Sequence, residues 1–378
     1  MGLINVLKYY FLNRKIVFVI ILGLFFAMCT NKKAAIITEP ETVLKLLTSE
    51  NNPRNSEGDF IKLKNGKILF VYSHYTGDSQ SDHAPAFLAG RYSSDGGNTW
   101  TVKDEVIIPN EGNMNIMSVS LLRLQNNDIA LFYLRKNSIS DCTPLMRISK
   151  DEAESWSEPV QCITDKKGYF VVNNDRVIQL KNGRIVMPVS LHKTEDSEYS
   201  NSGRLWCYYS DNNGLTWQVS EEILKADTVI TQEPGIIELM NGDIMMLIRA
   251  NGGIQYQSFS KDKGETWSFA EPGTINSPLS PASVARIPKT NDLVLVWNNN
   301  GEKGPGYFKG KRNPLTIAIS KDEGKTWQNI KNIEDNPDVA FCYTAIHCTD
   351  DHILLGYGVW IKYVDQYITK IDYNWLYQ

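Results

Sequence analysis

The sequence predicts an all-β protein, a six-bladed β-propeller of four-stranded antiparallel blades over residues 51–378. The first observation behind this prediction is a short polar turn that ends in tryptophan and occurs five times. Its copies are SSDGGNTW (93–100), SKDEAESW (149–156), SDNNGLTW (210–217), SKDKGETW (260–267) and SKDEGKTW (320–327). They lie 50 to 61 residues apart, and a period of this size indicates a repeat architecture.

The second observation is a hairpin pattern that occurs six times between those turns. Its copies are LKNGKIL (63–69), LQNNDIA (124–130), LKNGRIV (180–186), LMNGDIM (239–245), PKTNDLV (288–294) and CTDDHIL (348–354). Asn-Gly between apolar runs is the strongest short hairpin signal, because a type I′ turn needs positive φ at both central residues. Eighteen tyrosines and nine tryptophans also favour strands.

Each repeat therefore contains four strands, two joined by the hairpin and two joined by the tryptophan turn. The sixth repeat, near YITKIDY (367–373), lacks the tryptophan turn. A four-stranded sheet with two apolar faces is not stable alone, and six such sheets arranged radially bury each other's faces. This is why we expect a closed ring.

The first 29 residues differ from the rest. Lys8, Arg14 and Lys15 precede an uncharged run over residues 16–28, which predicts a secretory signal and is shorter than the about 20 residues of a membrane span. The order Phe-Ala-Met-Cys at 26–29 resembles a bacterial lipobox, with Cys29 as the lipidated residue. We expect a tether over 30–50 and an exported lipoprotein, periplasmic or at the outer membrane or surface of a Gram-negative cell. A cleaved soluble protein and an uncleaved anchor are the alternatives.

The composition narrows the possible partners. A net charge of −4 with 42% hydrophobic residues fits a large folded core and argues against a nucleic-acid partner. If Cys29 is lipidated, the membrane is contacted only through that anchor. The five other cysteines are odd in number and have no metal-binding spacing, so we expect buried free thiols at Cys142, Cys162, Cys207, Cys342 and Cys348.

The strand order also predicts where a site would lie. Adjacent antiparallel strands reverse direction, so hairpins and tryptophan turns share one face and the other connections share the opposite face. Innermost strands line the axis, so the connections next to them surround a central cavity. They carry Arg54, Asn115, Asn174, Asp175, Arg176, Glu233, Ser280 and Tyr343, and also His74, Asp78, Asp82, Arg135, His192, Arg249 and Arg312.

The tryptophan turn resembles the Asp box, Ser-x-Asp-x-Gly-x-Thr-Trp, of sialidases and other bacterial neuraminidase-repeat proteins. Three copies match it fully, the second carries Ala153 and Ser155, and the third carries Asn212. We interpret the box as structural: its Asp accepts hydrogen bonds from the turn's own backbone and its Trp fills the gap between adjacent strands.

The resemblance covers almost the whole propeller and implies a retaining exo-α-sialidase, or a relative acting on another 2-keto sugar acid, with a sialylated or other acidic glycan as substrate. By this resemblance Tyr343 in CYTAI is the nucleophile, Glu233 in QEPGIIELMNG activates it, and Asp82 is the acid and then the base. A carboxylate nucleophile would be repelled by the substrate's own carboxylate, and a tyrosine of pKa near 10 needs a base beside it.

Three arginines, Arg54, Arg249 and Arg312, are expected to bind the substrate carboxylate, because guanidinium groups do so bidentately. The family's first arginine usually stands in Arg-Ile-Pro, whereas Arg54 is followed by Asn-Ser-Glu. We read the Arg-Ile-Pro at 286–288 as coincidence, because it lies in another repeat. Further substrate-binding groups are expected at Arg135, Arg176, Asp175 and His192. No metal and no organic cofactor is implied.

Two other interpretations stay open, because a fold does not fix a function. One is a different acidic-sugar glycosidase or a polysaccharide lyase on the same scaffold. A lyase needs a base that abstracts a proton next to a carboxylate, and His74 or His192 with a tyrosine could serve. The other is a carbohydrate-binding propeller without catalysis.

Overall fold

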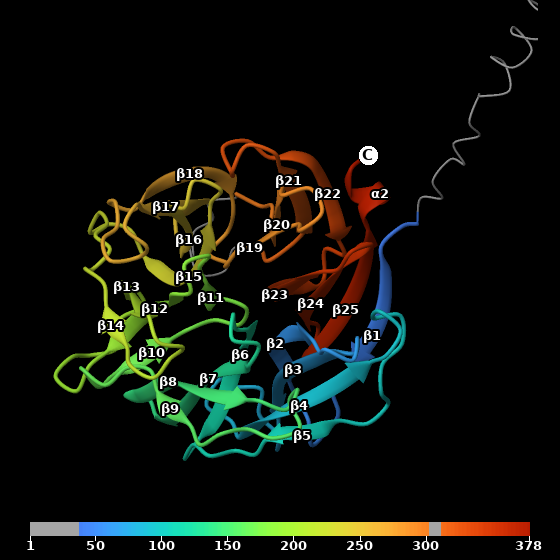
Figure 1. Cartoon of the computed structure of the whole chain (residues 1–378), viewed down its shortest axis with the longest axis horizontal. Coiled ribbons are helices and arrows are strands. Elements are labelled where there is room, and N and C mark those ends of the chain that lie inside the picture. The colour runs from blue at the N-terminus through green and yellow to red at the C-terminus, as the bar shows by residue number, and fades with distance from the viewer. Residues whose placement is uncertain (1–37, 302–310) are drawn as a thin grey trace, which may run out of the picture. The chain divides into compact units, whose positions relative to one another are not determined.

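The computed structural model describes residues 38–301 and 311–378, and this part of the chain is built almost entirely from antiparallel strands arranged around a centre (Figure 1). It contains four sheets of four strands and one sheet of nine. The signal segment expected at 1–29, with Cys29, lies outside the described residues. Within the described ranges no helix is long and apolar enough to span a membrane.

Three of the four-stranded sheets are each formed by consecutive strands. The first contains β2 (Asn55–Lys62), β3 (Ile68–Tyr75), β4 (Ala86–Ser93) and β5 (Glu105–Ile108). The second contains β15 (Thr231–Glu238), β16 (Ile244–Ala250), β17 (Ile254–Ser260) and β18 (Glu271–Asn276). The third contains β19 (Ser283–Arg286), β20 (Leu293–Asn298), β21 (Leu315–Ser320) and β22 (Gln328–Glu334).

The nine-stranded sheet stands where the sequence predicts two separate four-stranded sheets. Its strands are β6 (Asn115–Arg123), β7 (Ile129–Ser138), β8 (Asp141–Ser149), β9 (Val160–Gln161), β10 (Tyr169–Val171), β11 (Ile178–Gln179), β12 (Ile185–Lys193), β13 (Arg204–Ser210) and β14 (Gln218–Val219). The join is β10, which pairs with β12 and contributes one parallel pair, Tyr169 with Cys142, to β8.

The remaining sheet combines the two ends of the described chain. It contains β23 (Ala340–Cys348), β24 (His352–Trp360), β25 (Val364–Asp372) and β1 (Glu41–Leu46), and it is followed by the short helix α2 (Tyr373–Leu376). β1 pairs antiparallel with β25, and Figure 1 shows the two strands side by side. The tether expected over 30–50 is therefore wrong for Glu41–Leu46, because this segment supplies the outer strand of the last sheet and buries Leu46.

Apolar side chains fill the spaces between successive sheets all the way round. Leu69 of β3 and Leu131 of β7 belong to one cluster, and later clusters join each following group of strands to the next. The last cluster joins Leu354 and Ile368 to Phe70 of the first sheet. The core is thus a closed series of interfaces between sheets, which matches the expected burial of each sheet's faces by its neighbours.

The tryptophan turns have the internal bonding that the sequence predicts. In the first copy the carboxylate of Asp95 accepts hydrogen bonds from Thr99 N (2.9 Å) and Thr99 Oγ1 (2.6 Å), and Trp100 Nε1 donates to Gly97 O (3.1 Å). In the third copy Asn212 Oδ1 accepts from Thr216 N (2.9 Å), so the amide replaces the carboxylate without loss of that bond. The turns are structural, and none of these residues lines the cavity described below.

Four of the innermost strands share an irregularity that the sequence does not predict. Register shifts occur in β2, β6, β15 and β23, and each shift contains a non-glycine residue with positive φ: Glu57 (57°), Ser118 (61°), Glu233 (27°) and Tyr343 (58°). A β-bulge re-aims a side chain out of the regular alternation. Four sheets thereby turn one polar side chain each toward the centre of the ring.

Candidate active site

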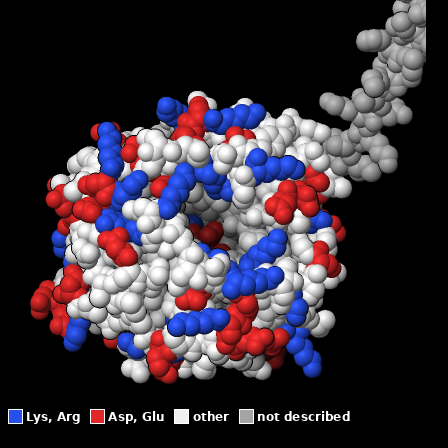
Figure 2. Space-filling view, viewed as in Figure 1, with Lys and Arg blue, Asp and Glu red and all other residues white. Residues whose placement is uncertain are grey.

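A cavity of about 300 Å³ lies at the centre, and its lining comes from β2, β6, β7, β8, β10, β12, β15, β16 and β23 and the loops beside them. Figure 2 shows this molecule hollowed near its centre, with acidic and basic side chains around the hollow. The lining residues are Glu57, Asp82, Met117, Ser118, Leu134, Lys136, Cys142, Tyr169, Val171, Asn173, His192, Tyr199, Gln232, Glu233, Arg249, Arg312 and Tyr343. All four bulge residues are among them.

One wall carries a tyrosine, a glutamate and an arginine in contact. Tyr343 Oη lies 3.4 Å from Glu233 Oε1, and Arg249 Nη1 donates to Glu233 Oε2 at 2.5 Å. Burial and the neighbouring charge of Glu233 raise the pKa of the Tyr343 hydroxyl above its ordinary value. Tyr343 is therefore protonated at neutral pH, with a carboxylate oxygen placed to accept its proton.

Arg312 completes this wall. Its guanidinium lies over the Tyr343 ring, 5.3 Å from the ring centre. Burial alone would lower its pKa, but Cys342, Tyr343 and Glu233 outweigh burial and raise the pKa above its usual value. Among the described residues no carboxylate forms an ion pair with Arg312. The side chain is thus a fixed cation that faces the cavity with donors available for an anion.

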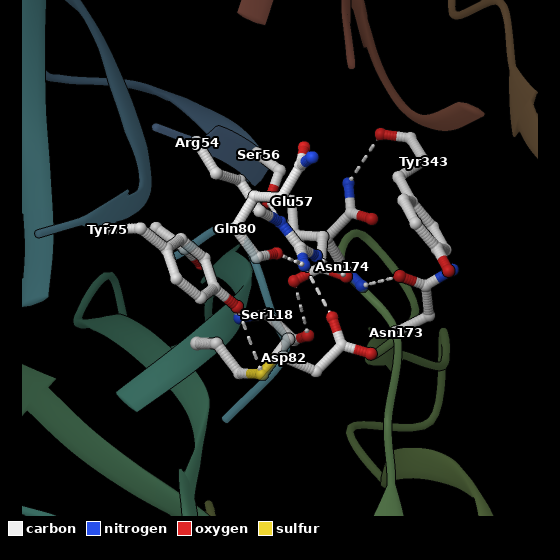
Figure 3. A network of polar contacts seen from close by, with 12 residues as sticks. Arg54, Ser56, Glu57, Tyr75, Gln80, Asp82, Ser118, Asn173, Asn174 and Tyr343 are labelled. Carbon is white, nitrogen blue, oxygen red and sulfur yellow. Dashed lines mark hydrogen bonds and ion pairs between the residues drawn. The ribbon is translucent and has the colours of Figure 1, made fainter. Parts of the chain in front are cut away.

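The opposite part of the site is a carboxylate pair held by one arginine (Figure 3). Arg54 donates from Nη1 to Asp82, from Nη2 to Glu57 Oε1 (3.3 Å) and from Nε to Ser56 Oγ (2.8 Å). Ser118 Oγ donates to the other oxygen of Glu57 at 3.2 Å. Arg54 itself is not part of the cavity lining. The expected direct grip of Arg54 on a substrate is not what this arrangement provides, because its donors are taken by its neighbours.

The two carboxyl groups have opposite protonation behaviour. Burial raises the pKa of Glu57 to about 7, although Arg54 acts against this. Partial desolvation by the surrounding protein would also raise the pKa of Asp82, but Arg54 and Lys136 outweigh this effect and hold that pKa at about 2. The Asp82 side chain is 60% exposed whereas that of Glu57 is 6% exposed. Asp82 therefore stands at the mouth as a carboxylate, and Glu57 lies at the floor as a partly protonated acid.

His192 also lines the cavity, and both of its ring nitrogens are occupied. Nδ1 bonds to Ser200 O at 2.8 Å, Nε2 bonds to Ser190 Oγ at 3.0 Å, and the ring stacks on Tyr199 with 5.5 Å between centres. A carbonyl can only accept, so Nδ1 carries the proton. Burial lowers the pKa of His192, which keeps the imidazole neutral.

The other histidine considered for a base, His74, does not line the cavity. Its Nδ1 lies 3.2 Å from Asp104 Oδ2, and its ring stacks on Phe87. Asp78, the alternative to Asp82 in the same loop, is exposed and is also absent from the lining.

Besides Arg54, three further residues expected to bind substrate lie outside the cavity lining, and these predictions are corrected by the structure. Arg135 and Lys136 are neighbours on β7, and side chains alternate along a strand, so Lys136 faces the cavity in place of Arg135. Asp175 is half-buried and accepts a hydrogen bond from Ile346 N at 2.9 Å. Arg176 is buried beside it and donates to Ser283 Oγ at 3.1 Å. Both therefore connect the loop before β11 to inner strands of other sheets, β23 and β19.

Sequence reasoning missed Glu57, Ser118 and Lys136. Glu57 had no clear signal in the sequence, because it stands in the polar stretch NSEGD and the burial of its neighbours is known only from the structure. The signal for Lys136 was the alternation of side chains along β7, which points Lys136 to the side opposite Arg135. Ser118 had no signal, since the bulge that re-aims it is not encoded in a recognisable turn. Among the described residues no group of three or more His, Cys, Asp or Glu side chains is placed to hold a metal ion.

The cysteines behave as expected within the described part of the chain. Cys142, Cys162, Cys207 and Cys342 are buried free thiols and Cys348 is a half-buried one. Burial raises the pKa of Cys142, which lines the cavity, to about 12. It is a protonated, inert thiol rather than a nucleophile.

Comparison with known proteins assigns the family. The model of the BNR repeat-like domain matches residues 88–356, so the chain belongs to this family, within the superfamily of bacterial sialidases and BNR-repeat proteins. A sialidase of Bacteroides fragilis is 29% identical over 185 residues, covering 47% of this chain and 32% of that protein. A sialidase of Clostridium perfringens is 24% identical over 270 residues, covering 64% of this chain and 68% of that protein.

The fold is shared with solved sialidases. The structure of Trypanosoma rangeli sialidase in complex with the inhibitor DANA aligns with a TM-score of 0.65 at 18% identity, covering 85% of this chain and 55% of that chain. The described chain is therefore an all-β, propeller-like member of the superfamily. It spans about a third of the Bacteroides relative and about two thirds of the Clostridium relative.

Proposed function

We propose that this protein is a retaining exo-α-sialidase-like glycoside hydrolase, which releases a terminal sialic acid or a related 2-keto sugar acid from a glycoconjugate. The observation that carries the proposal is the contact between Tyr343 and Glu233 in a cavity that also exposes Arg249 and Arg312. Sialidases among the sequence relatives support the same class of reaction and a sialylated substrate.

In the first step Tyr343 Oη forms a bond to the anomeric carbon as the bond to the leaving oxygen breaks. Glu233 takes the tyrosine proton, which is necessary because the pKa of Tyr343 lies above its ordinary value. The neutral phenol is not repelled by a substrate carboxylate as a carboxylate nucleophile would be. In the second step water replaces Tyr343 and the anomeric configuration is retained.

The substrate carboxylate is bound by Arg312 and Arg249. Arg312 has no ion-pair carboxylate among the described residues, and Arg249 lines the cavity with only Nη1 bonded to Glu233. Both arginines therefore have capacity for an incoming anion. Arg54 supports the reaction by holding Glu57 and Asp82.

We assign the acid and base role to Asp82 because it stands at the open mouth, where a leaving group departs. Its pKa of about 2 depends on Arg54 and Lys136, so Asp82 must gain a proton before it can donate one. The negative charge of a bound substrate carboxylate would raise the pKa of Asp82 by like-charge repulsion and favour this protonation. Glu57 is too deeply buried to reach a leaving group at the mouth.

The proposal includes a six-bladed propeller. The nine-stranded sheet is interpreted as two blades joined through β10, which has only three residues. Apolar clusters on both sides of each strand group support this division. We further propose, from residues 1–29 of the sequence alone, that the protein is exported as a lipoprotein acylated on Cys29.

Hydrolysis of aryl glycosides of several 2-keto sugar acids tests the function. We expect release of the aryl group and, by proton NMR, first formation of the retained anomer. Arg312→Ala should lower kcat/KM by about 100- to 1,000-fold, since it removes a charged contact to the substrate. Arg286→Ala is the matched control, because Arg286 forms an ion pair with Glu323 outside the cavity; its rate should be unchanged once folding is verified.

Other outcomes would replace the proposal. Formation of an unsaturated, ultraviolet-absorbing product would indicate a lyase, and binding without turnover would indicate a carbohydrate-binding protein. The lyase has less support, because Nε2 of His192 is engaged by Ser190 and His74 is outside the cavity.

A further inference from the structure

Lys136 is a buried cation that the proposed reaction does not use. It lies on β7, only 2% exposed, and it lines the cavity. Its Nζ donates to Asp82 O at 2.7 Å and contacts Met117 Sδ at 3.5 Å, and it lies 5.2 Å from the centre of the Tyr169 ring. An ammonium group has three donors. A single carbonyl oxygen and a weakly accepting sulfur leave one donor of Lys136 without an oxygen acceptor.

Several apolar and aromatic side chains line the same cavity as Lys136. They include Met117, Leu134, Cys142, Tyr169 and Val171. A buried ammonium is costly unless its donors are satisfied. No ion pair joins Lys136 to a carboxylate among the described residues, so the remaining donor is available to an oxygen atom inside the cavity.

The charges near Lys136 determine whether a neutral or a negatively charged oxygen can bind to its Nζ. Lys136 lowers the pKa of both Glu57 and Asp82, which places its ammonium within electrostatic reach of two acids. A further negative group beside Lys136 would be repelled by ionised Asp82. A neutral hydroxyl can accept from Nζ without that repulsion, and it can donate in turn to a carboxylate.

We propose that Lys136 forms a hydroxyl-binding subsite, in which its Nζ donates to one hydroxyl of the sugar acid and so determines specificity for a sugar that carries it. This inference rests on the proposed function, because it takes the cavity to be the sugar-acid site. It assigns the substrate carboxylate to Arg249 and Arg312 and a ring or side-chain hydroxyl to Lys136, two contacts on different strands.

A thermodynamic cycle tests the subsite. Aryl glycosides that each lack one hydroxyl are compared with the full substrate in wild type and in Lys136→Met, which has similar volume and no charge. In wild type one deoxy substrate should lose about 10- to 100-fold in kcat/KM, the range for a hydrogen bond to a charged group. In Lys136→Met the kcat/KM for the full substrate should fall by a similar factor. The kcat/KM for that deoxy substrate should then be only slightly lower than the value for the full substrate in the same variant.

Lys167→Met is the control, since the Lys167 side chain is 83% exposed and lies outside the cavity. The kcat/KM of this variant for each deoxy substrate, relative to the full substrate, should match that of wild type. Equal loss for every substrate in Lys136→Met would overturn the inference, because it would mean that Lys136 acts only through Asp82. No loss at all would also overturn it.

The two proposals can fail separately. If substrates are turned over but the cycle shows no coupling between Lys136 and any hydroxyl, the hydrolase proposal stands and the subsite proposal is rejected. If no glycoside is cleaved, the same cycle is run on the binding of the free sugar acids and their deoxy forms by calorimetry; coupling there would support the subsite while the hydrolase fails. Absence of binding would remove both.

Discussion

At the scale of single residues, the cavity depends on side chains held in an uncommon backbone conformation. Glu57, Ser118, Glu233 and Tyr343 all have positive φ and all line the cavity. Positive φ in a non-glycine residue costs about 1 kcal/mol or more, and such residues cluster where the surrounding structure serves a function. Their recurrence on four different sheets indicates that the bulges exist to aim polar groups inward.

Glu57 makes the wild-type stability depend on pH. Its pKa is about 7 in the folded protein against 4.5 in the unfolded chain, so the folded state binds more protons between these values and the free energy of unfolding falls as pH rises through them. The loss is about 3 kcal/mol at 1.36 kcal/mol per pKa unit. In Glu57→Gln the free energy of unfolding should not show this decrease. Urea denaturation of both proteins at pH 5 and pH 8 measures the difference.

The exposed carboxyl of Glu105 provides the matched control, Glu105→Gln. This control should follow the wild-type pH dependence. If Glu57→Gln follows it as well, Glu57 is not the buried acid that the contacts with Arg54 and Ser118 describe.

Among the strands and turns, local sequence patterns determine the turns, whereas the first strand, β1, is determined by pairing with a strand that is distant in the sequence. The Asn-Gly hairpins and the Asp boxes were predictable because each signal lies within about eight residues and fixes its own hydrogen bonds. β1 was not predictable in the same way. No hairpin joins its sequence, ETVLKL, to its partner β25, which lies more than 300 residues away.

β1 should be essential for stability. It covers the edge of β25, it buries Leu46, and Thr48 beyond it donates to Asp365 Oδ1 from N (2.9 Å) and Oγ1 (2.8 Å). Removal of residues 1–48 should cost about 3–5 kcal/mol and lower Tm by about 10 °C. It would also expose an unpaired strand edge that favours aggregation.

Removal of residues 1–37 leaves β1 in place and is the control for this truncation. Scanning calorimetry of the two shortened proteins should separate them. Equal melting temperatures would mean that β1 contributes nothing to closing the ring.

At the scale of the whole molecule, the strand arrangement brings together residues from distant parts of the sequence. The sequence predicted that Asp82, His192, Glu233, Arg249, Arg312 and Tyr343 would share a cavity, and all six line it. This was possible because the repeat period dictates which connections meet at the axis. Glu57 and Lys136 were missed and Arg135 was misplaced, because bulges and strand alternation decide side-chain direction one residue at a time.

In the proposed reaction Tyr343 attacks the anomeric carbon of a bound 2-keto sugar acid. The most direct test is incubation with a fluorinated sugar acid that slows breakdown of a glycosyl-enzyme, followed by mass spectrometry of the digested protein. We expect one added glycosyl group, located on the peptide that contains Tyr343, and no addition to Tyr343→Phe. A glycosyl group on another residue, or full turnover of a normal substrate by Tyr343→Phe, would contradict it.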